Sequence, residues 1–221
     1  MVLIYEKSFA SHLHAEEWNY NLNKKIPRQI PINSENKFWF NCRKCNHSFR
    51  SSLYNISQGK WCSYCGNKKL CNNKKCRRCF RRSFASNLHS NKWNYELNSL
   101  TPREVFKNSN KRYWFDCKVC NHIFEASISN ISGKSYSHYC PYCTNQKLCE
   151  NLECKKCYEK SFASDERSKS WNFVLNDTTP RKVFKNTHKS FWFNCEKYGH
   201  FFENTLNHIS DGRWCPYCQK I

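Results

Sequence analysis

The sequence predicts a small α+β fold that is stabilised by metal and occurs three times in tandem. Two observations lead to this prediction. One pattern of residues returns three times along the 221 residues, and nearly all of the 17 cysteines lie in Cys-x-x-Cys pairs. Such pairs indicate metal ligation in a chain without a secretory signal, and we expect none because the apolar run at residues 1–4 is too short. Modules of about 60 residues commonly need a metal, because their core alone stabilises them little.

The repeat is recognised by landmarks that return in the same order. These are Ser-Phe-Ala-Ser from Ser8, Ser83 and Ser161, Trp-Asn from Trp18, Trp93 and Trp171, Pro-Arg ending at Arg28, Arg103 and Arg181, aromatic-Trp-Phe around Trp39, Trp114 and Trp192, and His-x-Phe from His47, His122 and His200. Copy two also carries a three-residue insertion near Tyr136. We therefore predict modules at residues 1–65, 83–143 and 161–221, joined by cysteine-rich linkers at residues 66–82 and 144–160.

Within a module, local patterns predict one short helix followed by a small antiparallel sheet. The polar stretch from Ser-Phe-Ala-Ser to Trp-Asn has sparse apolar residues and a Ser at its start, which favours a capped helix. Short aromatic or β-branched segments separated by Asn, Ser and Lys turns predict strands, in module two at Arg103–Phe106, Arg112–Asp116 and His122–Ser127. The Cys-x-x-Cys pairs then lie on turns at one end of the sheet.

Modules one and two each carry two complete Cys-x-x-Cys pairs, and four thiolates around a strand hairpin suit zinc. Buried free thiols are the alternative, and the spacing argues against them. The predicted sets are Cys42, Cys45, Cys62 and Cys65 in module one, and Cys117, Cys120, Cys140 and Cys143 in module two.

Module three departs from this pattern because Tyr198 stands where the second cysteine is expected. An imidazole readily replaces a thiolate at zinc, so we predict a site of Cys195, His200, Cys215 and Cys218. In the alternative, all three histidines of the His-x-Phe motif only pack near the cysteines. Because the first two modules already have four thiolates, we expect their histidines not to be ligands.

The linkers carry a second cysteine pattern, Cys71-x4-Cys76-x2-Cys79 and Cys149-x4-Cys154-x2-Cys157. Three cysteines suggest a metal but leave the fourth ligand open. His89 is a candidate for the first linker, yet Arg167 takes its place in the second; a residue of a neighbouring module or a water is the alternative. Counting these clusters, we expect at least two zinc ions, three with module three, and up to five.

The chain is basic, with 37 Lys and Arg against 17 Asp and Glu and a formal net charge of +20. Thiolates at five zinc sites lower this to about +13. A basic surface favours a polyanionic partner, with nucleic acid ahead of acidic membrane or acidic protein. The densest cluster of cations lies in the first linker, and its predicted phosphate-binding residues are Lys68, Lys69, Lys74, Lys75, Arg77, Arg78, Arg81 and Arg82. The alternative is a solvated connector.

Other recurring residues have a structural interpretation. The Pro-Arg arginines, Arg28, Arg103 and Arg181, either stack on a tryptophan or reach a phosphate, and packing is favoured because all three copies keep them. The recurring Trp and Phe residues are expected in the module cores rather than as platforms for bases.

The run aromatic-Trp-Phe-x-Cys-x-x-Cys-x-His-x-Phe, followed by Cys-Pro-Tyr-Cys, resembles the probable zinc-ribbon or treble-clef zinc finger family. The resemblance covers residues 8–65, 83–143 and 161–218. It implies zinc at the knuckle cysteines, where a knuckle is a Cys-x-x-Cys pair with its turn. It also implies short antiparallel sheets and short helices. That family occurs as tandem arrays in large DNA viruses, and in bacteria beside endonuclease-like domains.

No carboxylate pair, Ser-His-Asp set or phosphate-cradling Gly loop recurs, so we expect no enzymatic activity and no small-molecule substrate. The sequence shows no membrane-spanning segment, and we expect an intracellular or virion location. Two functions compete: an array that binds DNA or RNA through its basic surfaces, and a structural or protein-interaction protein, for example of a virion, whose zinc sites only stabilise it.

Overall fold

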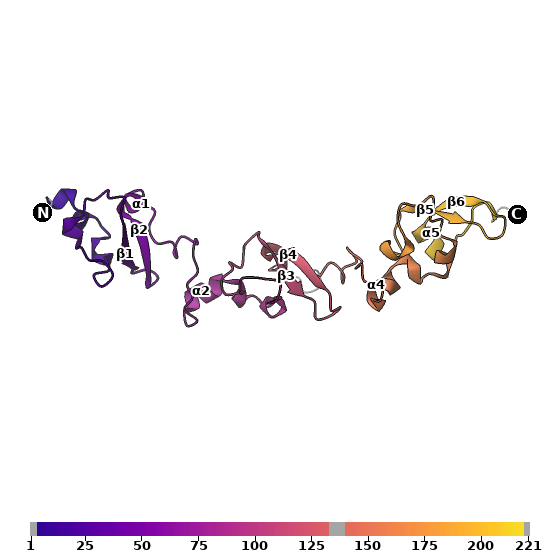
Figure 1. The fold of residues 1–221 in the computed structure, drawn as a ribbon, viewed down its shortest axis with the longest axis horizontal. Helices are drawn as coiled ribbons and strands as arrows, with labels where there is room; N and C mark the ends of the chain where they lie inside the picture. Colours follow the sequence, from indigo (N-terminus) through magenta and orange to yellow (C-terminus); the bar gives the residue numbers. More distant parts are fainter. Residues whose placement is uncertain (1–3, 133–139, 219–221) are drawn as a thin grey trace. The chain divides into compact units, whose positions relative to one another are not determined.

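The computed structural model describes residues 4–132 and 140–218 (Figure 1), so the predicted insertion near Tyr136 lies outside the described residues. The chain divides into two compact units. Unit 1 comprises Met1–Lys111 with Ser127–Ser132, and unit 2 comprises Arg112–Ala126 with Gly133–Ile221. No helix of the described residues is both long and apolar enough to cross a membrane.

Each copy of the repeat contains one two-stranded antiparallel hairpin, as predicted. The strands are β1 (Lys37–Cys42) with β2 (His47–Ser52), β3 (Arg112–Asp116) with β4 (Ile123–Ser127), and β5 (Ser190–Asn194) with β6 (Phe201–Thr205). In the first hairpin Phe40 pairs with Phe49 and Cys42 pairs with His47. The register therefore places the first knuckle cysteine and the His-x-Phe histidine opposite each other at the hairpin end.

A short helix follows the second strand of each copy, a feature that the sequence did not predict. These helices are α1 (Leu53–Ser57), α3 (Ile128–Ile131) and α5 (Leu206–Ser210). A hydroxyl residue caps each of them: Ser52, Ser127 and Thr205 accept a hydrogen bond from the backbone N–H three residues later. The cap satisfies a backbone donor where the chain leaves the strand.

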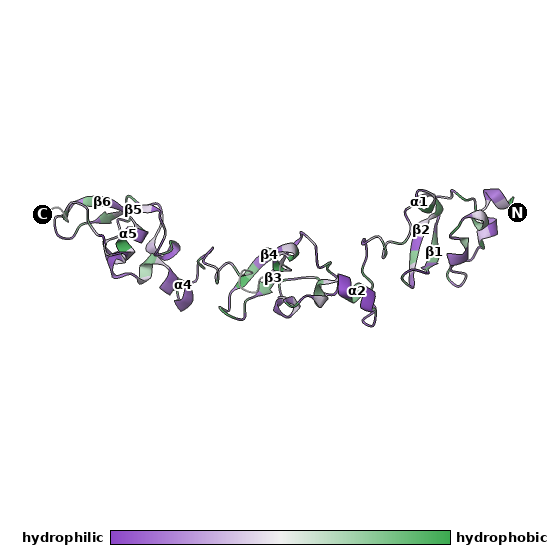
Figure 2. Ribbon diagram, turned by 180° about the vertical axis from the view of Figure 1, so that it is seen from behind, coloured by the Kyte–Doolittle hydropathy of each residue, from purple (hydrophilic) through white to green (hydrophobic). Residues whose placement is uncertain are grey.

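The linkers each contain a helix as well, α2 (Arg77–Arg82) and α4 (Lys155–Lys160). In Figure 2 these two helices are mostly purple, whereas α1 and α5 show green segments. The third cysteine of each linker, Cys79 or Cys157, lies inside the helix and is buried. The linkers are therefore folded around their cysteines.

Two predicted elements differ from the structure. The stretch from Ser-Phe-Ala-Ser to Trp-Asn is not one helix but a series of short 3₁₀ turns. The residue after each turn has an extended backbone, and its N–H donates to the carbonyl oxygen of the first residue of the turn, so the turn ends there. The turns before the hairpins span Tyr5–Lys7, Phe9–Ser11, Ala15–Glu17, Pro27–Gln29, Phe84–Ser86, Ser90–Lys92, Phe162–Ser164, Glu166–Ser170 and Pro180–Lys182. Residues Arg103–Phe106 form no strand; Phe106 makes only an isolated bridge with Ser83.

Aromatic residues of the strands and 3₁₀ turns form the cores. In unit 1 Phe9 and Phe40 are fully buried, with ring centres 5.6 Å apart, and Leu53 of α1 packs in the same cluster. The same cluster recurs in unit 2 with Phe162, Phe193 and Leu206. Cys42 and Cys62 belong to the first cluster, and Cys195 and Cys215 to the second, so each core is continuous with its knuckle cysteines.

The recurring tryptophans divide into two groups. Those of the Trp-Asn motif are at most 2% exposed, and their indole N–H groups donate to a backbone carbonyl seven residues later: Trp18, Trp93 and Trp171. The strand tryptophans Trp114 and Trp192 are 39% and 37% exposed. The expected core position is therefore confirmed for the first group and wrong for these two, because they point to the outer face of a two-stranded sheet.

Candidate metal centres

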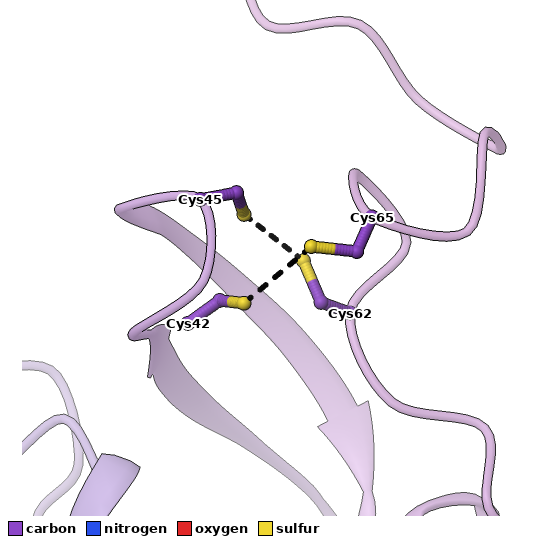
Figure 3. A group of neighbouring side chains, drawn as sticks. All are labelled: Cys42, Cys45, Cys62 and Cys65. Atoms are coloured by element: carbon purple, nitrogen blue, oxygen red, sulfur yellow. Dashed lines mark hydrogen bonds between the residues drawn. The ribbon is translucent and has the colours of Figure 1, made fainter. Parts of the chain in front are cut away.

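The four cysteines of module one converge at the end of the first hairpin (Figure 3). The Cys42–Cys45 turn connects β1 to β2, and Asn46 completes it with a left-handed φ of 54°. Cys62 and Cys65 approach from the loop after α1. The Sγ atoms of Cys42 and Cys65 lie 3.7 Å apart, and those of Cys45 and Cys62 lie 3.5 Å apart. Tetrahedral zinc with bonds of about 2.3 Å requires about 3.8 Å between sulfurs, so the cluster fits this ion.

Unit 2 holds the equivalent cluster of Cys117, Cys120, Cys140 and Cys143. Its sulfur separations are 3.6 Å between Cys117 and Cys143 and 3.5 Å between Cys120 and Cys140. Asn121 adopts the same left-handed conformation as Asn46, with a φ of 59°. The same knuckle geometry is thus built twice from the same residue types.

The divergent module brings its predicted residues together in a third cluster. The Nε2 of His200 lies 3.1 Å from the Sγ of Cys215, and the Sγ atoms of Cys195 and Cys218 lie 3.5 Å apart. Gly199 takes the left-handed position of the turn, and Tyr198 is half exposed to solvent. The imidazole therefore lies where Cys45 and Cys120 contribute a thiolate in the other modules.

Each linker cluster is completed by the histidine of the preceding module. The alternative of a residue from a neighbouring module therefore holds, and the expectation that these histidines are not ligands is wrong. The Nε2 of His47 lies 3.5 Å from the Sγ atoms of Cys76 and Cys79, and Cys71 completes the group. In unit 2 the Nε2 of His122 lies 3.5 Å from Cys154 and 3.4 Å from Cys157, with Cys149 beside them. Tetrahedral zinc with one nitrogen ligand requires about 3.5 Å between nitrogen and sulfur. Both groups therefore suit zinc with three thiolates and one imidazole.

His89, the candidate that the sequence suggested for the first linker, takes another position. Its ring nitrogen Nδ1 lies 3.3 Å from the Nζ of Lys92, and the side chain is buried. A signal for the correct residue was present: modules one and two keep a histidine although their knuckles have four thiolates, and each following linker lacks one ligand. Two partial patterns in neighbouring segments thus belonged to one site.

A tyrosine of the second knuckle stacks on each imidazole that completes a linker cluster. The rings of His47 and Tyr64 are stacked with centres 4.3 Å apart, and His122 and Tyr142 are stacked at 4.2 Å. In module three Tyr217 is instead perpendicular to His200, at 5.1 Å. The stacked arrangement accompanies the histidines that face a linker cluster, which explains the tyrosine of the Cys-x-Tyr-Cys motif in modules one and two.

Burial opposes the charged forms of the buried thiols and imidazoles in the linker clusters. Burial, the largest cause, raises the pKa of Cys79 and Cys157 to about 11, with neighbouring thiols adding to the effect. Burial likewise lowers the pKa of His47 and His122. At neutral pH the imidazoles are therefore neutral and available as ligands, and a divalent ion supplies the charge that keeps the thiols deprotonated.

Side-chain cations of each linker helix donate hydrogen bonds to the knuckles of the preceding module. In α2, Arg78 donates to the carbonyl oxygen of Lys44 and Arg82 donates to that of Tyr64, so both knuckles of the first cluster are contacted. In α4 the equivalent donors are Lys156, to Val119, and Lys160, to Tyr142. Both positions keep a cation in the two linkers, and each cation donates to a knuckle carbonyl. Of the predicted phosphate-binding residues, Arg78 and Arg82 therefore have partners within the protein.

The Pro-Arg arginines of the second and third copies contact the linker clusters and not a tryptophan. Arg103 donates to the Sγ of Cys71 at 3.9 Å and to the carbonyl oxygen of Asn73 at 3.2 Å. Arg181 makes the same contacts with Cys149 at 3.8 Å and Asn151 at 2.7 Å. These arginines therefore have partners within the protein, and the expected tryptophan partner is wrong. Each Cys3His cluster thus combines a histidine of one copy, three linker cysteines and an arginine of the next copy.

Removing this arginine is expected to weaken one zinc site without abolishing it. The hydrogen bond from Arg103 stabilises the Cys71 thiolate, and loss of such an outer contact costs about 10–100-fold in metal affinity. We expect Arg103→Ala to raise the fraction of one zinc ion captured by a chromophoric chelator. Arg28→Ala is the matched control, because Arg28 lies over the Tyr5 ring at 5.3 Å and touches no cluster cysteine. Equal zinc loss from both variants would contradict the assignment.

The chain matches the model of a family described as a probable treble clef zinc finger domain in three segments, residues 14–68, 89–146 and 168–221. It is also 37% identical over 213 residues to the uncharacterized protein R635 of Acanthamoeba polyphaga mimivirus. That match covers 95% of this chain, which spans about half (51%) of the length of the relative. With three matched copies and five Cys/His clusters suited to zinc, the chain belongs to the treble clef zinc finger family.

Proposed function

We propose that this chain binds nucleic acid, DNA or RNA, through basic surfaces held in place by its zinc centres, and that it does so without catalysis. The observation that carries the proposal is the first linker. Of its eight cations, six are exposed to solvent: Lys68, Lys69, Lys74, Lys75, Arg77 and Arg81. No Asp or Glu lies among them.

The zinc cluster of this linker supports the proposal because it gives the cations a fixed scaffold. Cys71 lies between the two pairs of lysines, Cys76 lies between Lys75 and Arg77, and Cys79 lies inside α2 with His47 against it. Arg77 and Arg81 are four residues apart and share the outer face of this helix. Fixed cations lose less conformational entropy on meeting phosphates than cations of a flexible connector do.

The second linker has the same scaffold with a different charge. Lys155 corresponds to Arg77, but Glu159 replaces Arg81, and Glu150 and Glu153 precede the helix. The two linkers therefore form a natural comparison in which the fold is constant and the net charge differs.

Replacing Arg77 and Arg81 with Ala is expected to weaken binding to DNA and RNA about equally across sequences. The variant neutralises fewer phosphates, so the slope of log affinity against log salt should fall by about 0.9 for each phosphate left unneutralised on duplex DNA. The measurement is a titration of labelled oligonucleotide at two or more salt concentrations. Zinc content should not change, because neither arginine contacts a ligand or knuckle.

Two variants serve as controls. Lys155→Ala removes the equivalent cation of the less basic linker and should change affinity little. Arg78→Ala with Arg82→Ala removes as much charge as the test variant but breaks the knuckle contacts, and should lower zinc retention. An unchanged affinity and salt slope in the Arg77 and Arg81 variant would favour the second candidate, a structural or protein-interaction protein.

A further inference from the structure

A pocket of one composition recurs in both units. In unit 1 it has a volume of about 550 Å³ and is lined by Asn67, Arg82, Phe106, Lys107, Asn108 and Ser109. In unit 2 it has a volume of about 370 Å³ and is lined by Asn145, Lys160, Phe184, Lys185, Asn186 and Thr187. Position by position, the residues are identical or keep their chemistry: a cation replaces a cation and a hydroxyl replaces a hydroxyl.

The same backbone contacts build both pockets. The linker helix ends at Arg82, whose carbonyl oxygen accepts a hydrogen bond from the backbone N–H of Lys107 at 3.1 Å. Lys160 and Lys185 repeat this bond at 3.1 Å in unit 2. Asn67 and Asn145, which also line the pockets, both have a left-handed φ, 57° and 55°. The pocket is thus a product of the folded linker meeting the turn after the Pro-Arg motif.

The lining is suited to a phosphate joined to a planar polar ring. Two cations can neutralise a phosphate, two amides and a hydroxyl offer hydrogen bonds of both kinds, and a phenyl ring offers a stacking surface. No Asp or Glu is among the lining residues of either pocket. Both volumes lie within the roughly 300–1,000 Å³ typical of small-molecule sites.

We propose that each pocket binds one nucleotide unit of a single-stranded nucleic acid, with its phosphate at Lys107 and its base at Phe106, and equivalently at Lys185 and Phe184. Arg82 and Lys160 donate to knuckle carbonyls and add positive charge beside the phosphate. This inference rests on the proposed nucleic-acid function and specifies its ligand. An unpaired strand is specified because a base within a duplex is stacked and cannot turn its face to an aromatic side chain.

The first copy of the repeat provides an internal contrast. The bridge between Ser8 and Pro31 corresponds to the bridges of Ser83 with Phe106 and of Ser161 with Phe184. Pro31 and Ile32 therefore stand where the pocket residues Phe106 and Lys107 stand in the second copy. Neither the ring nor the cation is kept there, so the chain is expected to hold two nucleotide pockets.

The test uses the full chain, a fluorescent oligothymidylate of about 15 nucleotides and a duplex of the same length. Lys107→Ala with Lys185→Ala should lower affinity for the single strand at least tenfold and reduce the salt slope by about 0.7 for each phosphate left unneutralised. Phe106→Leu with Phe184→Leu should lower affinity at least fivefold with no change in slope, because stacking carries no net charge. The charge-matched control is Lys111→Ala with Lys189→Ala, two exposed lysines outside the pockets, and it should retain affinity within about threefold.

The outcomes separate the pocket from the broader function. Equal losses of affinity in the control and the pocket variants, or a preference for the duplex, would overturn the pocket while leaving nucleic-acid binding in place. Failure of the unmodified chain to bind either probe at low salt would overturn both. If zinc content shows that the Phe variant is misfolded, photocrosslinking of a bromouridine-substituted strand to the unmodified chain decides instead. Crosslinks within residues 106–109 and 184–187 support the pocket, and crosslinks confined elsewhere contradict it.

Discussion

Removal of zinc is expected to unfold both units of the chain. The sheets of the described residues are two-stranded and their helices have at most six residues, and neither type of element is stable alone in water. A structural zinc site contributes about 10–16 kcal/mol in small zinc-finger peptides, against about 5–15 kcal/mol for the whole stability of a typical domain. Cys42 and Cys62 belong to one core and Cys195 and Cys215 to another, so neither core is expected to survive without its ion.

Tryptophan fluorescence and metal analysis test this expectation together. The chain as purified should carry five zinc ions, and a strong chelator should shift the emission of the buried Trp18, Trp93 and Trp171 towards that of solvated indole. Returned zinc should restore the original emission, whereas magnesium, which prefers oxygen ligands, should not. A preparation never exposed to chelator that carries fewer than two zinc ions, or one that keeps its emission after chelation, would refute the zinc assignment.

Substitution of either histidine that completes a linker cluster is expected to release one zinc ion. His47→Ala leaves the first linker cluster with three thiolates, His122→Ala does the same in the second, and the double variant should lose two ions. His200→Ala should also release one ion, from module three. An incomplete set of three ligands does not make a closed structural site, so the expected change is a loss and not a small drop in affinity.

Native mass spectrometry counts the ions in each variant. His89→Ala is the control, because His89 is buried like a ligand but contacts Lys92. It should keep all five ions. The four-thiolate cluster beside His47 should stay intact in His47→Ala, so the emission of Trp18 should not change. Retention of five ions by His47→Ala would show that the linker clusters take their fourth ligand elsewhere.

The two classes of zinc site differ in how far the sequence predicts them. Cys42 and Cys45 lie in one hairpin, Cys62 and Cys65 lie in the loop after the short helix α1, and local spacing was enough to group them. The pairs Cys76–His47 and Cys79–His47 are separated by 29 and 32 residues, across a loop, a helix and a knuckle. The prediction that the histidine is not a ligand rests on the four thiolates already present in its module. Spacing alone does not show that the imidazole faces the linker cluster instead.

The basic linker shows the same limit at the level of single side chains. Eight cations look equivalent in the sequence, and only the presence of α2 divides them. Residues 78 and 82 share one helix face and meet the knuckle carbonyls, whereas residues 77 and 81 share another and remain exposed. A helix of six residues that begins directly after Cys76 has no propensity signal strong enough to be predicted, because tertiary contacts stabilise it.

By itself the sequence determined the threefold repeat, the hairpins, the four-thiolate sets, the set with His200 and the basic character of the first linker. Each of these features follows from local spacing and residue type. Only the tertiary structure decided that His47 and His122 complete the linker clusters, that Arg103 and Arg181 contact those clusters, and that two pockets of one composition exist. These features join segments more than twenty residues apart, and their geometry depends on how a folded linker packs against the repeats on either side.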